Sequence, residues 1–130
     1  MTRVKRPLSP HLSIYKPQIS SVLSILNRAT GLALYAGTIL MVAWLWSAAY
    51  APESYTTLHQ WLTTIPGKLL LLGWTAAFYF HLFAGIRHLL WDTGRCLTVP
   101  AVDKTGILAI ILTIAFTAFT WGVAISAGVQ

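Results

Sequence analysis

The sequence predicts an all-α membrane protein in which three transmembrane helices form a bundle, with the N-terminus cytoplasmic and the C-terminus extracytoplasmic. The chain has 130 residues, 56% of them hydrophobic, and a mean hydropathy of +0.67. This composition is too apolar for an ordinary soluble domain, and the length allows only a few spans. The sequence also contains long apolar runs, and most of its charges lie outside them, as expected for membrane spans. We expect one membrane-anchor domain, residues 1–130.

Residues 1–20 are expected to form a cytoplasmic arm. They contain three prolines, four cations and no long apolar core, so they are neither a span nor a typical secretory signal. The prolines disfavour a continuous helix and suit an extended segment that lies against a partner or the lipid headgroups. A disordered basic tail held to anionic lipid is the alternative.

The first span is expected at about residues 22–51. No charge occurs between residues 29 and 52, and the run is long enough to cross about 30 Å of hydrocarbon. Trp44, Trp46 and Tyr50 cluster at its far end, as in an interfacial aromatic belt.

Two further spans follow. Residues 52–67 are predicted to be a polar loop because prolines and a glycine bracket them. The second span covers about 68–91, and a second loop at 92–105 carries Pro100 as a helix breaker. The third span, about 105–129, is uncharged and rich in small residues, which allow helices to approach closely.

The charge distribution predicts the orientation. The net charge is +6, and five of the nine basic residues precede the first uncharged run. With Arg95 and Lys104 in the second loop, the positive-inside rule places the N-terminus and that loop in the cytoplasm. We interpret the basic excess as topology and expect no nucleic-acid partner. Cys96 is the only cysteine, so it is expected to be a free thiol.

The chemistry is expected on the second span. His81, Gly85, His88 and Asp92 fall at i, i+4, i+7 and i+11, so they share one helical stripe that must face something polar. His81 lies eleven residues before Asp92, about 16 Å at the helical rise. If Asp92 marks the water boundary, the imidazole lies near mid-membrane.

An imidazole at this depth suits a metal, since one ring nitrogen can ligate iron while a hydrogen bond holds the other. Gly85, one turn on, would leave a flat side for a porphyrin. His88 lies about 10.5 Å further along the helix, where the carboxylates of a haem could meet cations such as His88 and Arg87. The alternative is that His81 only forms a hydrogen bond to a neighbouring helix.

A second constellation opens the first span. Ser24 and Arg28 are i, i+4 neighbours on one helix face, at the same membrane boundary as His88 and Asp92. A hydroxyl and a guanidinium there could bind a carbonyl ligand, or the guanidinium could pair with a haem carboxylate. Alternatively, Arg28 reaches a lipid phosphate.

Two segments of the chain resemble the signatures of the cytochrome b membrane-anchor subunit of succinate dehydrogenase, the succinate:quinone oxidoreductase called complex II. The resemblance covers residues 6–31 and 81–94 directly. The matching residues are Arg6-Pro7-Leu8-Ser9-Pro10-His11-Leu12-x-Ile14-Tyr15, Ser24 to Gly31, and His81-x-x-x-Gly85-Ile86-Arg87-His88-x-x-Trp91-Asp92-x-Gly94.

The resemblance implies specific roles. His81 would be an axial ligand of the iron of a b-type haem, a metal-binding role, and Ser24 and Arg28 would line the ubiquinone pocket. His88 and Arg28 are further candidates for haem contacts. The family usually has His directly before this Arg, whereas this chain has Asn27. Asn27 carries no charge, so its contact with a haem carboxylate would be weaker.

The second axial ligand is expected from another chain. His11 lies in the arm, His59 in the loop at the opposite end, and His88 two turns from His81 on the same helix. None of them can face His81 across a porphyrin. The resemblance likewise implies that a second small membrane-anchor subunit supplies the other axial His and shares the haem.

The resemblance implies an electron path from succinate through a flavoprotein subunit and an iron–sulfur subunit to ubiquinone, as part of the tricarboxylic acid cycle and electron transport. The chain has no flavin motif and no cysteine cluster for iron–sulfur ligation, so those subunits would hold these groups. The expected location is a bacterial inner membrane, or a mitochondrial inner membrane if the gene is organellar. The competing class is a non-redox assembly or transport subunit whose polar residues only hold helices together.

The predicted orientation can be tested with a topology reporter fused after Gln130. We expect the fusion to be active on the extracytoplasmic side, because the cations before the first span and in the second loop retain those segments in the cytoplasm. Activity on the cytoplasmic side would contradict the orientation and the depth assigned to His81.

Overall fold

The computed structural model describes residue 11 and residues 16–128, and most of the expected cytoplasmic arm, residues 1–20, lies outside this range. The described residues form four α-helices and no strand. Three of these helices are long and apolar enough to cross a membrane, which confirms the predicted all-α class with three candidate spans. The helices are α1 (Ile19–Tyr50), α2 (Pro52–Thr63), α3 (Ile65–Asp92) and α4 (Val99–Ser126).

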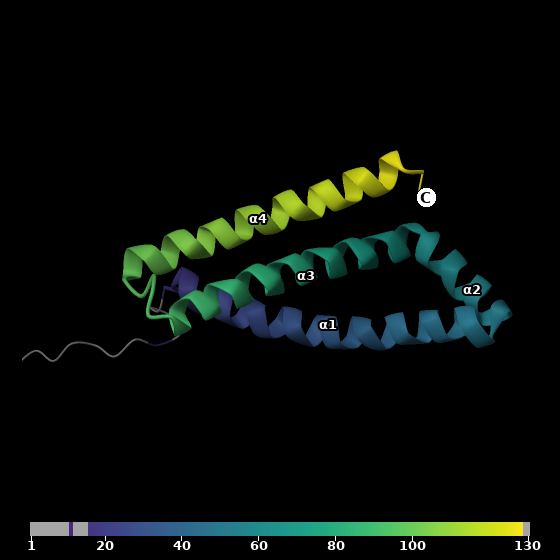
Figure 1. Cartoon of the computed structure of the whole chain (residues 1–130), viewed down its shortest axis with the longest axis horizontal. Helices are drawn as coiled ribbons and strands as arrows, with labels where there is room; N and C mark the ends of the chain where they lie inside the picture. The colour runs from purple at the N-terminus through teal and green to yellow at the C-terminus, as the bar shows by residue number, and fades with distance from the viewer. Residues whose placement is uncertain (1–10, 12–15, 129–130) are drawn as a thin grey trace, which may run out of the picture.

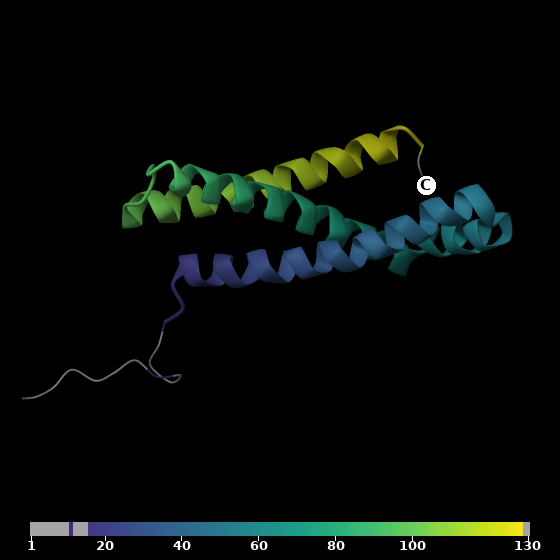
Figure 2. The same cartoon turned by 60° about the horizontal axis from the view of Figure 1, so that its bottom comes forward.

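The three long helices run alternately up and down, with α3 between α1 and α4 (Figure 1). α2 joins α1 to α3 at one end of the bundle. At the other end, the start of α1 lies near the end of α3 and the start of α4, as both side views show (Figures 1 and 2). Residues from the expected haem and quinone sites therefore meet at the end where α1 begins.

Residues 52–67, expected to be a polar loop, are almost entirely helical: they form α2 and the first residues of α3. The second loop, expected at 92–105, is also shorter, because α4 begins at Val99. Pro52, Pro66 and Pro100 each lie in the first turn of a helix. The missing N–H of proline is not needed there and its fixed φ favours helix initiation. The prolines therefore start helices rather than break them.

The helix boundaries differ from the expected spans at both ends. α1 begins at Ile19 rather than about residue 22, and α3 begins at Ile65 rather than about residue 68. The side chain of Thr64 caps α3 by accepting a hydrogen bond from the N–H of Gly67 at 3.3 Å. α4 ends at Ser126 rather than about residue 129.

The connection between α3 and α4 consists of residues 93–98. Gly94 has a φ of 76°, which glycine adopts without strain, and Cys96 has a φ of 58°. The Cys96 side chain is an exposed free thiol.

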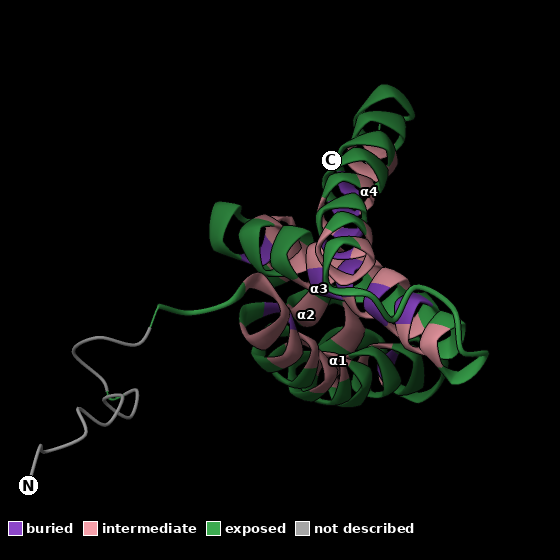
Figure 3. Cartoon of the chain, turned by 90° about the vertical axis from the view of Figure 1, so that its left-hand side faces the viewer, coloured by how far each residue is buried: buried purple, intermediate pink, exposed green. Residues whose placement is uncertain are grey.

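Few side chains are buried within this chain (Figure 3). The core is a small cluster of Leu23, Phe80 and Ala84, against which Ile19 and Ile110 pack. Most large apolar side chains on the outer faces are exposed. In a membrane protein these faces are covered by lipid or by other chains, because lipid tails are as apolar as the side chains themselves.

Glycines allow the helices to approach closely at two crossings. A Cβ added to Gly37 would collide with Nε1 of Trp74, so the indole ring of α3 rests directly on the α1 backbone. A Cβ on Gly106 would lie 2.5 Å from Cδ1 of Leu23, which brings α4 against α1. The crossings depend on these missing side chains.

Replacing Gly37 by Ala should lower the stability of the α1–α3 contact. The new methyl group would collide with the Trp74 indole, and overpacking of this kind costs typically about 1–3 kcal/mol. We expect a lower midpoint of thermal unfolding for the purified protein in detergent, measured by circular dichroism. Gly73→Ala is the matched control, because a Cβ at Gly73 meets nothing within 4 Å. Equal midpoints for the two variants would contradict the close contact.

Candidate functional site

α3 places His81 against the first half of α1. Nδ1 of the imidazole lies 3.1 Å from the backbone carbonyl oxygen of Asn27 and 3.4 Å from the hydroxyl oxygen of Thr30. The side chain is half-buried. The stripe predicted from the sequence therefore faces a neighbouring helix at this position.

The carbonyl contact identifies the tautomer of His81. A carbonyl oxygen can only accept a hydrogen bond, so Nδ1 carries the proton and donates it to Asn27. In the neutral imidazole the lone pair is then on Nε2, to which no residue in the described range forms a hydrogen bond. The interhelical bond expected as the alternative role is present, but it uses only one ring nitrogen. The other nitrogen is free in the state that ligates a metal.

Two glycines lie close to this histidine, one on α1 and one a turn further along α3. A Cβ on Gly31 would lie 3.1 Å from Cε1 of His81, so the ring sits on α1 where a side chain is missing. A Cβ on Gly85 would meet nothing within 4 Å among the described residues. The structure thus has open space at Gly85, the position expected to leave a flat side for a porphyrin.

His88 lies two turns further along α3. Its Nδ1 lies 2.6 Å from the backbone oxygen of Ala84, to which it donates, and its ring packs edge-on against Trp91 with centroids 5.0 Å apart. His88 is therefore oriented by its own helix. Its Nε2 faces away from this bond and is available to a ligand.

Arg87 is buried, with only 6% of its surface exposed. Nε donates to the hydroxyl of Thr105 at 3.1 Å and Nη2 to the backbone oxygen of Val102 at 3.0 Å. The guanidinium also lies over the ring of Trp91, 4.1 Å from its centroid. Arg87 thus joins α3 to α4 through uncharged oxygens. The sequence indicated Arg87, the neighbour of His88, as a cation that could meet the carboxylates of a haem, but did not indicate its burial.

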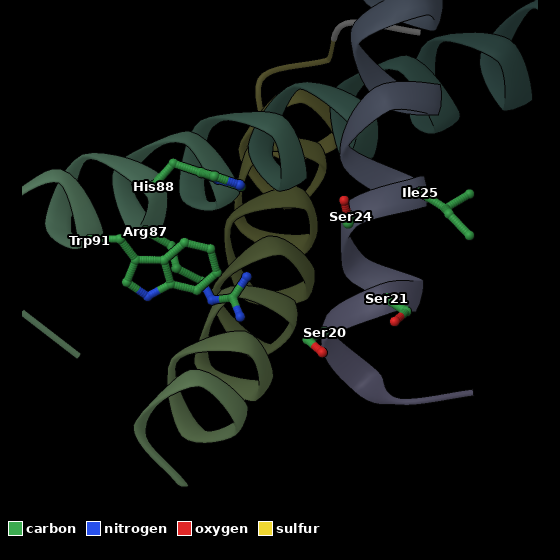
Figure 4. Close-up of a pocket in the computed structure, with 7 residues that line it drawn as sticks. All are labelled: Ser20, Ser21, Ser24, Ile25, Arg87, His88 and Trp91. Atoms are coloured by element: carbon green, nitrogen blue, oxygen red, sulfur yellow. The ribbon is translucent and has the colours of Figure 1, made fainter. Parts of the chain in front are cut away.

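An open pocket of about 400 Å³ lies between the start of α1 and the end of α3 (Figure 4). The structure brings two predicted residues together here, Ser24 and His88. Arg28 is exposed on α1 and is not among the lining residues. The residues that line the pocket are Ser20, Ser21, Ser24, Ile25, Arg87, His88 and Trp91.

The hydroxyls of Ser20 and Ser21 and the ring of Trp91 were not predicted from the sequence to line a pocket. The three serines recur at one end of α1, a signal that could have indicated a polar wall. In Figure 4 the Arg87 guanidinium points toward Ser20 across the pocket. The pocket therefore combines hydroxyls, a cation, an imidazole and an aromatic ring.

Within the described residues, no group of three or more His, Cys, Asp or Glu side chains could hold a metal ion. Asp92, the last residue of the predicted stripe, is exposed at the end of α3.

Residues 2–120 match the family model described as succinate dehydrogenase/fumarate reductase transmembrane subunit. The succinate dehydrogenase cytochrome b556 subunit of Rickettsia bellii is 43% identical over 117 residues, which cover 90% of this chain and 91% of the relative.

Relatives from other organisms are similar to this chain as well. The cytochrome b556 subunit of Paracoccus denitrificans is 34% identical, covering 92% of this chain and 98% of the relative. The mitochondrial cytochrome b560 subunit of Sus scrofa is 38% identical, covering 84% of this chain and 66% of the relative. With a family model matched over most of its length and relatives this similar, the chain belongs to the succinate dehydrogenase cytochrome b subunits, a family of membrane-spanning subunits.

Proposed function

We propose that this chain is the membrane-anchor subunit of a succinate:quinone oxidoreductase, where it helps to bind a b-type haem and ubiquinone. The observation that carries the proposal is the state of His81. Its Nδ1–H donates to the Asn27 carbonyl, and no described residue forms a hydrogen bond to its Nε2. His81 lies within a candidate membrane span. The names of the relatives include cytochrome b, which supports haem as the group that this histidine binds.

His81 would hold the haem iron through Nε2. The Asn27 carbonyl orients the imidazole, and the open space at Gly85 leaves room beside it. When bound, a b-type haem supplies a one-electron redox centre within the membrane. His88 and Arg28 would contribute positive or hydrogen-bonding groups toward its carboxylates, while Asn27 can offer only a neutral amide where the family usually has a histidine.

A second small anchor subunit would supply another histidine to hold the haem. His59 lies on α2, at the opposite end of the bundle, where its ring stacks on Tyr55 with centroids 5.6 Å apart. His88 is on the same helix as His81. The exposed apolar faces of α1 and α3 offer the surface against which such a partner could pack.

Ubiquinone would bind at the pocket where α1 begins. Ser24 can donate a hydrogen bond to a quinone carbonyl, and Trp91 offers an aromatic wall. Arg28, one turn beyond Ser24, is exposed on α1 and free to turn toward a carbonyl placed at the mouth of the pocket. The guanidinium would then form a charge-assisted hydrogen bond, which strengthens as the quinone oxygen gains negative charge.

The remaining redox centres would lie in other subunits. A flavoprotein subunit would oxidise succinate, and an iron–sulfur subunit would carry its electrons to the quinone pocket. We place the complex in a bacterial inner membrane, or in the mitochondrial inner membrane if the gene is organellar. This location agrees with the bacterial and mitochondrial relatives.

Replacing His81 by Ala should remove or convert the low-spin haem signal of the purified complex. The variant lacks the only histidine on α3 whose Nε2 we assign to the iron, so optical and electron paramagnetic resonance spectra should change. His59→Ala is the control, because His59 lies at the opposite end of the bundle, and it should keep the wild-type spectra.

The same spectra test the competing class. A wild-type complex without a b-type spectrum would favour a non-redox assembly or transport subunit. A bis-histidine spectrum from this chain alone, verified as a monomer, would contradict the shared haem.

Replacing Arg28 by Leu should lower the rate of quinone reduction at least about tenfold, since a hydrogen bond to a charged group contributes about 1.5–3 kcal/mol. Succinate oxidation with a soluble dye acceptor should remain close to wild type, because the dye takes electrons before the quinone pocket. Both rates are measured on the purified complex. Arg95→Leu removes an equal charge from the α3–α4 connection and serves as the control. If both activities of Arg28→Leu fell together, Arg28 would be an assembly residue.

A further inference from the structure

We propose that Thr30 is a positioning residue for His81. Its hydroxyl oxygen and the Asn27 carbonyl would together hold the Nδ1–H of the imidazole and thereby determine how strongly Nε2 donates to the haem iron. This inference rests on the proposed ligation of haem by His81 and goes beyond it, because it assigns a role to a residue that does not contact the iron.

The geometry requires Thr30 to accept rather than donate at His81. The hydroxyl has a single proton, and two backbone oxygens of its own helix are closer than the imidazole: Leu26 at 2.8 Å and Asn27 at 3.0 Å. With the proton directed there, only a lone pair of Oγ1 points toward Nδ1, 3.4 Å away. Both neighbours of Nδ1 are then acceptors, and the proton on Nδ1 is shared between them.

The Thr30 hydroxyl is held in one position by its own helix. A β-branched side chain has few χ1 rotamers in a helix, and the bond back to Leu26 selects the rotamer in use. The next residue, Gly31, provides the space in which the imidazole lies, since a Cβ there would be 3.1 Å from Cε1. One residue thus supplies an acceptor and the next supplies room for the ring.

The expected effect is on the ligand strength of His81. Hydrogen bonds from the distal ring nitrogen increase the basicity of the metal-binding nitrogen and fix the orientation of the ring. A more basic ligand favours the oxidised iron, which carries the greater charge. Removing the Thr30 acceptor should therefore raise the midpoint potential of the haem and broaden or shift its low-spin signal.

The test uses three variants of Thr30 in the intact complex. Thr30→Val keeps the shape but lacks the hydroxyl, Thr30→Ala lacks both hydroxyl and methyl groups, and Thr30→Ser restores the hydroxyl. Redox titration of the optical spectrum should give a more positive potential for Val and Ala. Ser should stay close to wild type.

Thr38→Val is the matched control. Thr38 makes the same bond back along α1, from Oγ1 to the Leu34 oxygen at 2.9 Å, and its side chain is exposed without contact to His81. This variant should leave the potential unchanged. A shift as large as that of Thr30→Val would show a general effect on α1 and would overturn the proposal.

Other outcomes also decide the matter. Wild-type potentials and spectra in both Thr30→Val and Thr30→Ala would overturn the proposal. A shift of the midpoint potential in Thr30→Ser equal to that in Thr30→Val would also overturn it. If haem is lost in Val and Ala but retained in Ser, the hydroxyl is needed to position the ligand and the proposal stands. Loss of haem in all three would overturn it.

These results are distinguishable from failure of the proposed function. That failure appears in the wild-type complex as a missing b-type spectrum, or as an unchanged spectrum in His81→Ala. The Thr30 series is compared with a wild-type complex that contains haem, so its outcome concerns the role of Thr30 alone.

Discussion

The hydrogen bond from His81 to the backbone carbonyl of Asn27 is the interaction on which the candidate site depends. As a source of stability it is small, since interhelical hydrogen bonds in membrane proteins contribute on average about 0.6 kcal/mol. Its importance lies in orientation. It joins α3 to α1, places the proton on one ring nitrogen and leaves the other nitrogen free, and the contact with Gly31 allows the ring to come this close.

The same end of the bundle depends on a second polar contact, between α3 and α4. Arg87 is buried, and such a cation is costly in an apolar environment unless its donors are satisfied. Thr105 and Val102 accept hydrogen bonds from two of its five N–H groups, and the guanidinium lies over the face of Trp91. Arg87 thereby holds the end of α3 against the start of α4 and places Trp91 at the pocket. The packing of α4 and the shape of the pocket are consequently linked through the Arg87 side chain.

The chain alone is an incomplete bundle. Its buried core is limited to a few side chains around Phe80, and large apolar residues are exposed along all three long helices. Lipid can cover these faces, but membership in a family of subunits also favours coverage by other chains. No described residue forms a hydrogen bond to Nε2 of His81, and a Cβ at Gly85 would meet nothing within 4 Å. Both positions therefore leave room for another group. Under the proposed function, a second anchor subunit would pack on the exposed surface near His81.

The sequence by itself determined the all-α class and the three candidate spans, because length and hydropathy are properties of the chain alone. The depth of His81 and the shared site of Ser24 and Arg28 stay predictions from helical spacing. The sequence did not predict α2, since prolines can either start or end a helix and only the fold shows which. Nor did it predict the contacts of His81 with Asn27 and Thr30, or the burial of Arg87 against α4. Helices that are apolar on every face carry no periodic signal that shows which face meets a neighbour. That choice is made by close packing at glycines and by the few polar groups that must find partners, so only the tertiary structure decided it.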